Sequence, residues 1–460
     1  MSAAAESVKL GRAFAVEFRN IERWDPASYH AIKWAWPAES MVRIGDLLTP
    51  RKEKVDRKQW RFDELQPVTV HNDGRISRRK VEGGRAYTMD LWFARPGDLL
   101  VAKIDLKNGA IAIVPVDWEN VAVTGHFVSF AMDRQRVVPE YLHRVFQLAA
   151  FRDLLWRNKV GAEGRKEVKL EFFLEQKIPL PPLATQRSII AHWQAGMQEA
   201  AKLEAKAAQV VEVARAGFVE ALGIRTTGLN ASHVRAFALD WNSISSWHGA
   251  SNLKRIAMGD VHQGRYPVVP GRDCLLSISH GCSVSPVTGV TGLEVLPISS
   301  VTKGFLDLSK RKHIPNREKL RERYALRKGD VLMCRTNGTL AYVGMSAFVD
   351  ADNANLIFPD KVIRVQPNED LLPEYLWLLL QTPPMRAQIE AAARTAVGNY
   401  AIGGKDIWDF DFPVPPKDVQ ASLAKKVIAA RANAARLKEQ AEQKRKETRE
   451  EVEGRVTGMK

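Results

Sequence analysis

Basic side chains that could contact a polyanion gather in two loop-rich stretches of the sequence. The first stretch contains Arg51, Lys52, Lys54, Arg57, Lys58, Arg78, Arg79 and Lys80, and the second contains Lys310, Arg311 and Lys312. Lysine and arginine neutralise phosphates, and arginine can read guanine through paired hydrogen bonds in the major groove. A single charge run is usually a solvated face, but two runs in a chain of net charge +15 favour nucleic acid as the partner.

A hairpin that occurs twice is a second candidate for base contacts. Each copy begins with Gly-Asp and two apolar residues, continues to a cation and reaches an Asn-Gly step. The cations are Lys103 and Arg335, and the steps are Asn108-Gly109 and Asn337-Gly338. We expect the tips to read bases through Asp105 and Asn108 in the first copy and Thr336 and Asn337 in the second. A plain hairpin that closes the core is the alternative.

Catalytic signatures are missing from the sequence. There is no GxxxxGK[ST] phosphate loop, no GxGxxG after a strand and no Asn/Asp-Pro-Pro-aromatic step for holding a flipped base. Asp360 and the Glu167-Val168-Lys169 triplet could form a magnesium nuclease site, but they belong to different repeats. The three cysteines and ten histidines show no metal-binding spacing. We therefore predict a non-catalytic chain with no cofactor or metal site of its own.

The elements that position these residues are duplicated. Val138-Pro139-Glu140-Tyr141-Leu142 is matched by Leu372-Pro373-Glu374-Tyr375-Leu376, and Ile178-Pro179-Leu180-Pro181-Pro182 is matched by Phe412-Pro413-Val414-Pro415-Pro416, both at an offset of 234 residues. Short strands are expected around residues 42–44, 99–101, 110–114 and 127–130, followed by one helix from Tyr141 to about Trp156. The predicted fold is α+β, with two similar domains in tandem, each followed by a long helix.

The long helices are expected to pair as an antiparallel coiled coil of ~55 Å. Their apolar faces carry Ile189, Trp193, Leu203 and Val210 in the first helix and Leu423, Val427 and Leu437 in the second. After Glu439 we expect a charged, solvated helix end. The alternative is that each helix packs on its own domain. The predicted boundaries are domain 1–182, helix 183–222, linker 223–230, domain 231–416 and helix 417–460.

Targeting signals are not evident in the sequence. No stretch approaches the ~20 apolar residues of a membrane span, and Met1-Ser2-Ala3-Ala4-Ala5-Glu6 does not match a signal peptide. We expect a cytoplasmic protein.

These features resemble the specificity subunit of type I restriction-modification enzymes, a phage-defence family. The most specific segment is Ile178-Pro179-Leu180-Pro181-Pro182-Leu183-Ala184-Thr185-Gln186-Arg187. The second copy departs from it at Lys417-Asp418-Val419, although Gln420 aligns with Gln186.

The resemblance implies that each domain is a target recognition domain reading half of a split double-stranded DNA site. It also implies that the helices space the domains and dock two methyltransferase subunits, which bind S-adenosylmethionine and methylate adenine N6. Restriction/translocase subunits join in a full complex.

Three other readings remain open. The chain could serve a related DNA-modification or phage-defence system without type I restriction. It could be an enzyme in its own right, which methyl transfer or cleavage by the purified chain would reveal. It could also be a coiled-coil scaffold, which salt-sensitive binding to duplex DNA would exclude.

Overall fold

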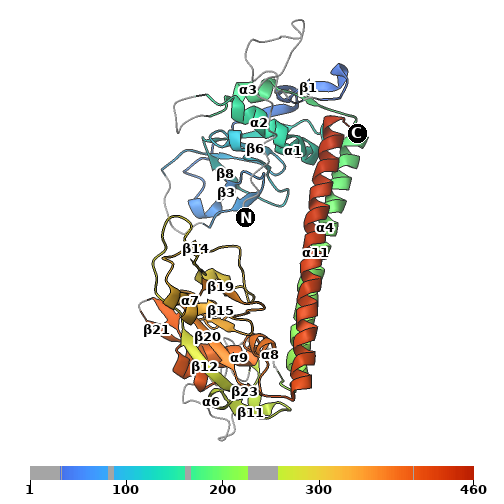
Figure 1. Cartoon of the computed structure of the whole chain (residues 1–460). Helices are drawn as coiled ribbons and strands as arrows, with labels where there is room; N and C mark the ends of the chain where they lie inside the picture. Colours follow the sequence, from blue (N-terminus) through green and yellow to red (C-terminus); the bar gives the residue numbers. More distant parts are fainter. Residues whose placement is uncertain are drawn as a thin grey trace. The chain divides into compact units, whose positions relative to one another are not determined.

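The computed structural model divides the chain into two compact units (Figure 1). It describes residues 32, 34–80, 88–160, 167–225, 257–396 and 398–459. Unit 1 consists of residues 1–201 and 441–460, and unit 2 consists of residues 202–440. The predicted linker, apart from residues 223–225, and the predicted start of the second domain lie outside the described residues.

Unit 1 is built on two four-stranded sheets and one two-stranded sheet. The antiparallel sheet has the order β2-β9-β6-β7, the mixed sheet has the order β4-β3-β8-β5 with β3 and β8 parallel, and β1 pairs with β10. The strands are β1 (Met41–Arg43), β2 (Leu48–Arg51), β3 (Gln66–Val70), β4 (Ile76–Arg78), β5 (Leu91–Phe93), β6 (Leu99–Ala102), β7 (Ile111–Ile113), β8 (Val121–Thr124), β9 (Phe127–Met132) and β10 (Lys177–Pro179). The four predicted strand positions are confirmed.

The helices of unit 1 are α1 (Pro139–Gln147), α2 (Ala149–Arg157) and α3 (Leu170–Glu175). The prediction of one helix from Tyr141 to Trp156 is therefore wrong, because the chain turns at Leu148, whose ψ of 138° is not helical. The turn lets α1 and α2 place Phe146 and Phe151 in one buried cluster, where their ring centroids lie 5.4 Å apart. A single straight helix could not point both apolar faces at that core.

Unit 2 repeats the sheet topology of unit 1. Its sheets have the orders β12-β20-β16-β18 and β14-β13-β19-β15, with β13 and β19 parallel, and β11 pairs with β23. The strands are β11 (Val268–Pro270), β12 (Leu275–His280), β13 (Glu294–Val295), β14 (Lys312–His313), β15 (Ala325–Leu326), β16 (Val331–Cys334), β18 (Ser346–Phe348), β19 (Asn353–Ile357), β20 (Val362–Pro367) and β23 (Asp411–Pro413). The matching order confirms the prediction of two similar domains.

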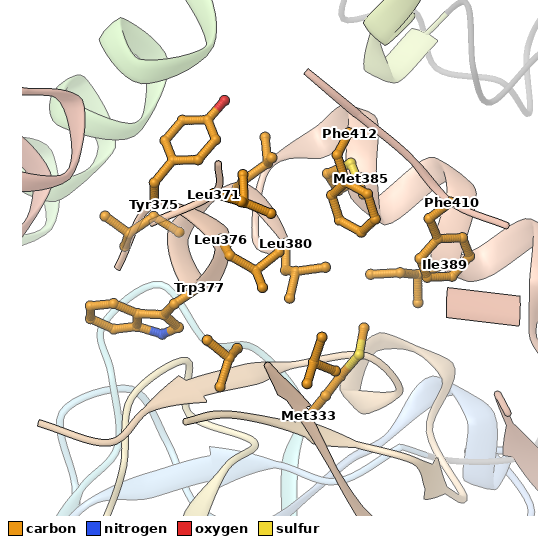
Figure 2. Packing of buried hydrophobic residues seen from close by; sticks show 14 of the residues in the cluster. Met333, Leu371, Tyr375, Leu376, Trp377, Leu380, Met385, Ile389, Phe410 and Phe412 are labelled. Atoms are coloured by element: carbon orange, nitrogen blue, oxygen red, sulfur yellow. The ribbon is translucent and has the colours of Figure 1, made fainter. Parts of the chain in front are cut away.

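Unit 2 also contains a small three-stranded sheet and its own set of helices. The sheet has the order β17-β22-β21, from β17 (Thr336–Asn337), β21 (Arg394–Ala396) and β22 (Asn399–Ala401). The helices are α6 (Gly271–Cys274), α7 (Glu318–Tyr324), α8 (Pro373–Leu379), α9 (Pro383–Ala392) and α10 (Gly404–Trp408). Figure 2 shows the core between α8, α9 and the sheet, where Tyr375, Leu376, Met385 and Phe412 are fully buried.

Two long helices, α4 (Leu183–Ala221) and α11 (Lys417–Thr457), contribute one half to each unit. In unit 1, His192 contacts Glu451 at 2.5 Å and Glu199 contacts Lys444 at 2.9 Å. Residue numbers therefore fall along α11 as they rise along α4, which confirms the predicted antiparallel pairing. In unit 2, Ala207 packs against Ala434 and Leu437, so the small seam residues bring the two helices into close contact.

The helix seam does not end at Glu439 as predicted. Thr448, Val452 and Val456 of α11 are buried, and the two valines join the core of unit 1. At Gly196 of α4, a Cβ would lie 2.2 Å from the Thr448 hydroxyl, so only glycine permits this approach. The prediction failed because the charged side chains here belong to the outer face of a helix whose inner face stays apolar.

A buried glutamine joins each long helix to the helix that follows the repeated Pro-Glu-Tyr-Leu start. In unit 1, Gln186 accepts a hydrogen bond from the Val138 amide at 2.7 Å and donates to the carbonyl oxygens of Arg136 and Pro181. Gln420 makes the same three bonds with Leu372, Asp370 and Pro415 in unit 2. Both glutamines are fully buried, so water cannot reach these groups. Without the glutamine side chain, the backbone amide and carbonyl groups would have no hydrogen-bond partner.

Candidate nucleic-acid interface

The first basic stretch of unit 1 is partly neutralised by its own carboxylates. Arg51 on β2 contacts the buried Asp98 at 2.8 Å, and Lys54 and Arg57 contact Asp90 at 2.9 and 2.5 Å. Lys52 and Lys58 are exposed, and within the described part of the chain neither forms an ion pair. Of this stretch, Lys52 and Lys58 are therefore the cations available to an outside phosphate.

The second basic stretch of unit 1 begins at Arg78, the last residue of β4. Arg78, Arg79 and Lys80 are all exposed, and the Arg78 guanidinium lies over the Trp118 ring at 4.8 Å. This stacking orders the Arg78 side chain without neutralising its charge. The segment is a row of exposed cations on an edge strand, an arrangement that suits phosphate contacts.

The hairpin of unit 1 is formed by β6 and β7, and its loop covers residues 103–110. Asn108 donates to the Asp105 carboxylate at 3.0 Å, so the two predicted base readers are tied to each other. Lys103 is partly buried at the start of the loop, and Asp105 is exposed. Arg152 of α2 donates a hydrogen bond to the Asn108 carbonyl at 3.0 Å and so holds the loop backbone in place.

The hairpin of unit 2 is formed by β16 and β18, and its loop covers residues 335–345. Thr336 and Asn337 pair with Ala401 and Tyr400, so they form an edge strand of the small sheet rather than a free tip. The Arg335 guanidinium faces the Asp360 carbonyl at 3.5 Å, and its Nε is buried without a hydrogen-bond partner. Thr336 and Asn337 are partly exposed residues, and a hydroxyl and a side-chain amide are groups that can contact base edges.

The two Asn-Gly steps are not equivalent, and the predicted match between them is wrong. Gly109 has a φ of +85°, and its counterpart by strand register is Gly344 with a φ of +78°, whereas Gly338 is not in the left-handed region. Arg386 donates to the Val343 carbonyl before Gly344, as Arg152 does to Asn108. The second loop is longer, and its Asn-Gly step comes six residues before Gly344, the glycine at its left-handed turn.

Arg152 and Arg386 were not among the predicted site residues. They lie at the same repeat offset as the Pro-Glu-Tyr-Leu motifs, so the duplication was the signal that could have identified them. Burial lowers the pKa of Arg386, and Glu390 opposes that shift through its charge. Both arginines act on loop backbone, which makes them positioning residues.

His280 on β12 is a titratable group near Arg335. The pKa of His280 is lowered, first by burial and then by the Arg335 charge. This shift favours the neutral imidazole, whose ring presents one donor and one acceptor.

The basic stretch of unit 2 lies on and before β14. Lys310, Arg311 and Lys312 are exposed, and Arg311 contacts Glu294 of β13 at 3.3 Å. Neither lysine forms an ion pair with a residue that the structure describes. Lys312 lies in β14 of the mixed sheet, whereas Thr336 and Asn337 lie in β17 of the small sheet. The fold therefore places the two predicted DNA-contacting groups on different sheets of unit 2.

The predicted helix-pairing residues lie on the seam. Ile189 packs in the core of unit 1, with Trp193 at its edge under the Arg144 guanidinium at 4.4 Å. Leu423 and Val427 pack in the core of unit 2, and Leu437 packs with Leu203 and Val210 around Ala207. Because these side chains face inward, a docked partner would meet the outer faces of the helices.

The described residues lack the arrangement that a metal site needs. No set of three histidine, cysteine or carboxylate side chains there is arranged to hold a metal ion. Glu167 belongs to unit 1 and Asp360 to unit 2, so the predicted alternative nuclease residues come from separate bodies. Among the helices that the structure describes, none is long and apolar enough to cross a membrane.

Comparison with known proteins bears on the duplicated fold. No family model matches the sequence. The chain is 26% identical over 278 residues to the type I restriction enzyme EcoKI specificity subunit of Escherichia coli strain K12, and the match covers 59% of this chain and 55% of that subunit. It therefore spans about half the length of this curated relative.

Solved structures extend the likeness over most of the chain. A chain from a type I R-M system aligns with a TM-score of 0.54 and 17% identity, covering 90% of this chain and 96% of that one. The chain is similar to type I specificity subunits. The predicted resemblance and fold class are confirmed. The HsdS subunit of Thermoanaerobacter tengcongensis gives a TM-score of 0.43 at 17% identity, covering 91% of this chain and 96% of that one.

Proposed function

We propose that the chain is the sequence-specific DNA-binding subunit of a type I restriction-modification complex. The observation that carries the proposal is one sheet topology present in both units, in a chain similar to the EcoKI specificity subunit. Each unit reads one half of a bipartite duplex site. In this role the chain is non-catalytic and works in the cytoplasm, and a partner methyltransferase supplies S-adenosylmethionine and the chemistry of adenine N6 methylation.

In the proposed complex, the exposed lysines position the duplex and the hairpin loops read its bases. Lys52 and Lys58 of unit 1 and Lys310 and Lys312 of unit 2 contact phosphates, which carry no sequence information. The edge strand at Thr336 and Asn337 contacts base edges in unit 2, and the loop at Asp105 and Asn108 does so in unit 1. Two methyltransferase subunits dock on the helices, and restriction subunits complete the assembly.

The test is to map methylated adenines in DNA from cells that express the chain with its methyltransferase. A single bipartite motif with an unspecified gap is expected. Exchanging Thr336 and Asn337 for alanine should change one half of the motif only, and exchanging Asp105 and Asn108 should change the other half. A continuous motif, or one pair of substitutions altering both halves, would overturn the assignment of one unit to each half.

A second measurement separates recognition from assembly. Co-purification of the methyltransferase with a Leu423→Lys variant tests the helices, because a buried charge should disrupt the seam and the docking surface with it. Weak, salt-sensitive DNA binding is expected to survive in unit 1. Full recovery of the complex with normal methylation would show that the helix pair is not the dock.

A further inference from the structure

Four arginines line one cavity of unit 2. The cavity has a volume of about 1040 Å³ and is bordered by α4, α9, α11 and the segment around Gly264. Its cations are Arg215, Arg225, Arg265 and Arg431, and its carboxylates are Glu212 and Glu220. Among the residues that the structure describes, none of the four guanidiniums forms an ion pair with a carboxylate. With four arginines against two glutamates, the lining has a net charge of +2.

Two of these cations are held close together by neutral acceptors. Arg431 donates to Oε1 of Gln381 at 2.6 Å and to the Gly304 carbonyl at 2.8 Å, and Arg215 donates to the same Gln381 oxygen at 3.3 Å. The Arg431 guanidinium also lies over the Trp377 ring at 4.5 Å. Burial, followed by the nearby Arg215 charge, lowers the pKa of Arg431 to about 10. Like charges at this separation repel, and a bound anion would remove the repulsion.

Two of the four cations have no basic counterpart in unit 1. The Arg265 amide donates to the Leu222 carbonyl, and in unit 1 the corresponding bond runs from the Ala35 amide to Thr457. Alanine thus takes the place of Arg265 in unit 1. At the repeat offset, Met197 takes the place of Arg431. Arg265 and Arg431 are therefore specific to unit 2, whereas Arg215 is matched at the same offset by Arg449, whose charge acts on Arg144 in unit 1.

The shape and place of the cavity favour a protein segment as the ligand. Phe218, Val219 and Val427 give it apolar walls between the guanidiniums, which suits a peptide with mixed side chains. In unit 2 the small sheet, marked by β21, lies on the side away from α11 in Figure 1, so DNA held at Thr336 would approach the other face. Residues 226–256 contain a single acidic residue, Asp240, which could offset only part of this net charge of +2.

We propose that this cavity binds an acidic segment of a partner protein, whose Asp and Glu carboxylates pair with the four guanidiniums. Arginine matches a carboxylate with two parallel hydrogen bonds, and such pairs are strongest where water is partly excluded. Arg225 and Arg265 are exposed and meet the segment at the rim, while Arg431 receives it further in. This contact goes beyond base reading and does not depend on it.

The experiment measures binding of a fluorescein-labelled hexaglutamate peptide to the full chain by anisotropy, with a labelled DNA duplex as the second probe. The test variant is Arg225→Ala with Arg265→Ala. The control variant is Arg272→Ala with Arg323→Ala, which removes the same charge from exposed positions of unit 2 outside the cavity. Thermal unfolding of both variants checks that unit 2 remains folded.

The proposal predicts that the test variant binds hexaglutamate about tenfold more weakly than the control, while both bind the duplex equally. An Arg265→Lys variant is expected to regain only part of the peptide affinity, because a lysine ammonium lacks the paired N–H groups of a guanidinium. Equal peptide binding by the test and control variants would overturn the proposal, as would the absence of peptide binding to the unmodified chain. If instead the test variant lost duplex affinity alone, the cavity would be a nucleic-acid contact.

Discussion

In unit 1, the buried carboxylate of Asp98 accepts hydrogen bonds from Arg51 at 2.8 Å and from Ser129 at 2.7 Å. In unit 2, the equivalent Asp330 forms an ion pair with Arg364 at 3.1 Å and accepts a hydrogen bond from Gln366 at 2.9 Å. The two cations come from different strands, β2 in the first case and β20 in the second.

Both units keep the buried aspartate, but they differ in the strand that carries its cation. Both aspartates accept the backbone amide three residues earlier, which closes the turn before the hairpin strand. Burial raises the pKa of Asp330, and its hydrogen bonds and the Arg364 charge oppose the shift. Each buried carboxylate needs a neutralising cation nearby, but the shared fold allows that cation to come from different strands. Arg51 is thus engaged within unit 1.

The largest effect that would test the equivalence of the units is a charge on the helix seam. Ile189 and Leu423 lie at the repeat offset and are buried in the cores of unit 1 and unit 2. Lysine at either position should reduce the free energy of unfolding of its own unit by about 3–5 kcal/mol, since a buried unpaired charge is costly. Urea unfolding of each variant measures the loss.

Matched controls lie one residue earlier on each helix. Ser188 and Ser422 are exposed, so Ser188→Lys and Ser422→Lys should change the free energy of unfolding by less than about 0.5 kcal/mol. If the seam variants matched these controls, the two helices would not share a buried face.

The next effect concerns the buried glutamines that attach the long helices. Gln186→Leu and Gln420→Leu should each cost about 2–3 kcal/mol, because each leaves one amide and two carbonyl groups without partners. Tyr141→Phe and Tyr375→Phe remove a single bond to Pro179 or Pro413 and should cost about 1 kcal/mol. Differential scanning calorimetry on the four variants would show equal losses in the two units if the attachment is shared.

A smaller and unequal effect is expected at the hairpin glycines. Alanine at Gly344 would place its Cβ 2.5 Å from Ile389, whereas at Gly109 the nearest atom is the mobile Arg152 side chain at 2.8 Å. Both have a positive φ, so Gly109→Ala should cost about 1 kcal/mol and Gly344→Ala about 2 kcal/mol. Thermal unfolding measures both values, and the reverse order would mean that the second loop can move away from α9.

The smallest effect distinguishes the units by pH. The pKa of His143 in α1 is lowered to about 4 by burial and by the Arg144 charge, whereas Trp377 takes this position in unit 2. In the unfolded chain the His143 imidazole takes up a proton near pH 6.5, whereas in the folded chain it stays neutral down to about pH 4. The free energy of unfolding of unit 1 therefore decreases as the pH falls from 6.5 towards 4. With a discount for partial exposure, we expect a loss of about 1 kcal/mol at pH 5.

Hydrogen exchange of α1 and α8 at pH 7 and pH 5, corrected for intrinsic rates, would detect this difference. His143→Gln keeps a donor for the Ile111 carbonyl and should remove the pH dependence from α1. An unchanged pH response in this variant would assign the effect to another group.

The parts of the fold that repetition encodes could be predicted from the sequence. Two Gly-Asp turns, two Pro-Glu-Tyr-Leu starts and two aligned glutamines identified equivalent domains and helices, and Ile189 and Leu423 lie where the apolar spacing placed them. The break between α1 and α2 at Leu148 could not be predicted from the sequence. The apolar spacing is helical on both sides of Leu148, and it does not show that the apolar faces of α1 and α2 must pack in the same core. The DNA contacts predicted here stay predictions.

The sequence by itself determined that this chain is duplicated, basic and built around two long helices, since these properties depend on order, composition and spacing. Only the tertiary structure decided which cations are free. Arg51 is held by a carboxylate 47 positions away, while Arg215 and Arg431 meet at one amide oxygen. A charge becomes available or neutralised through neighbours that folding brings from distant segments, and local sequence does not carry that information.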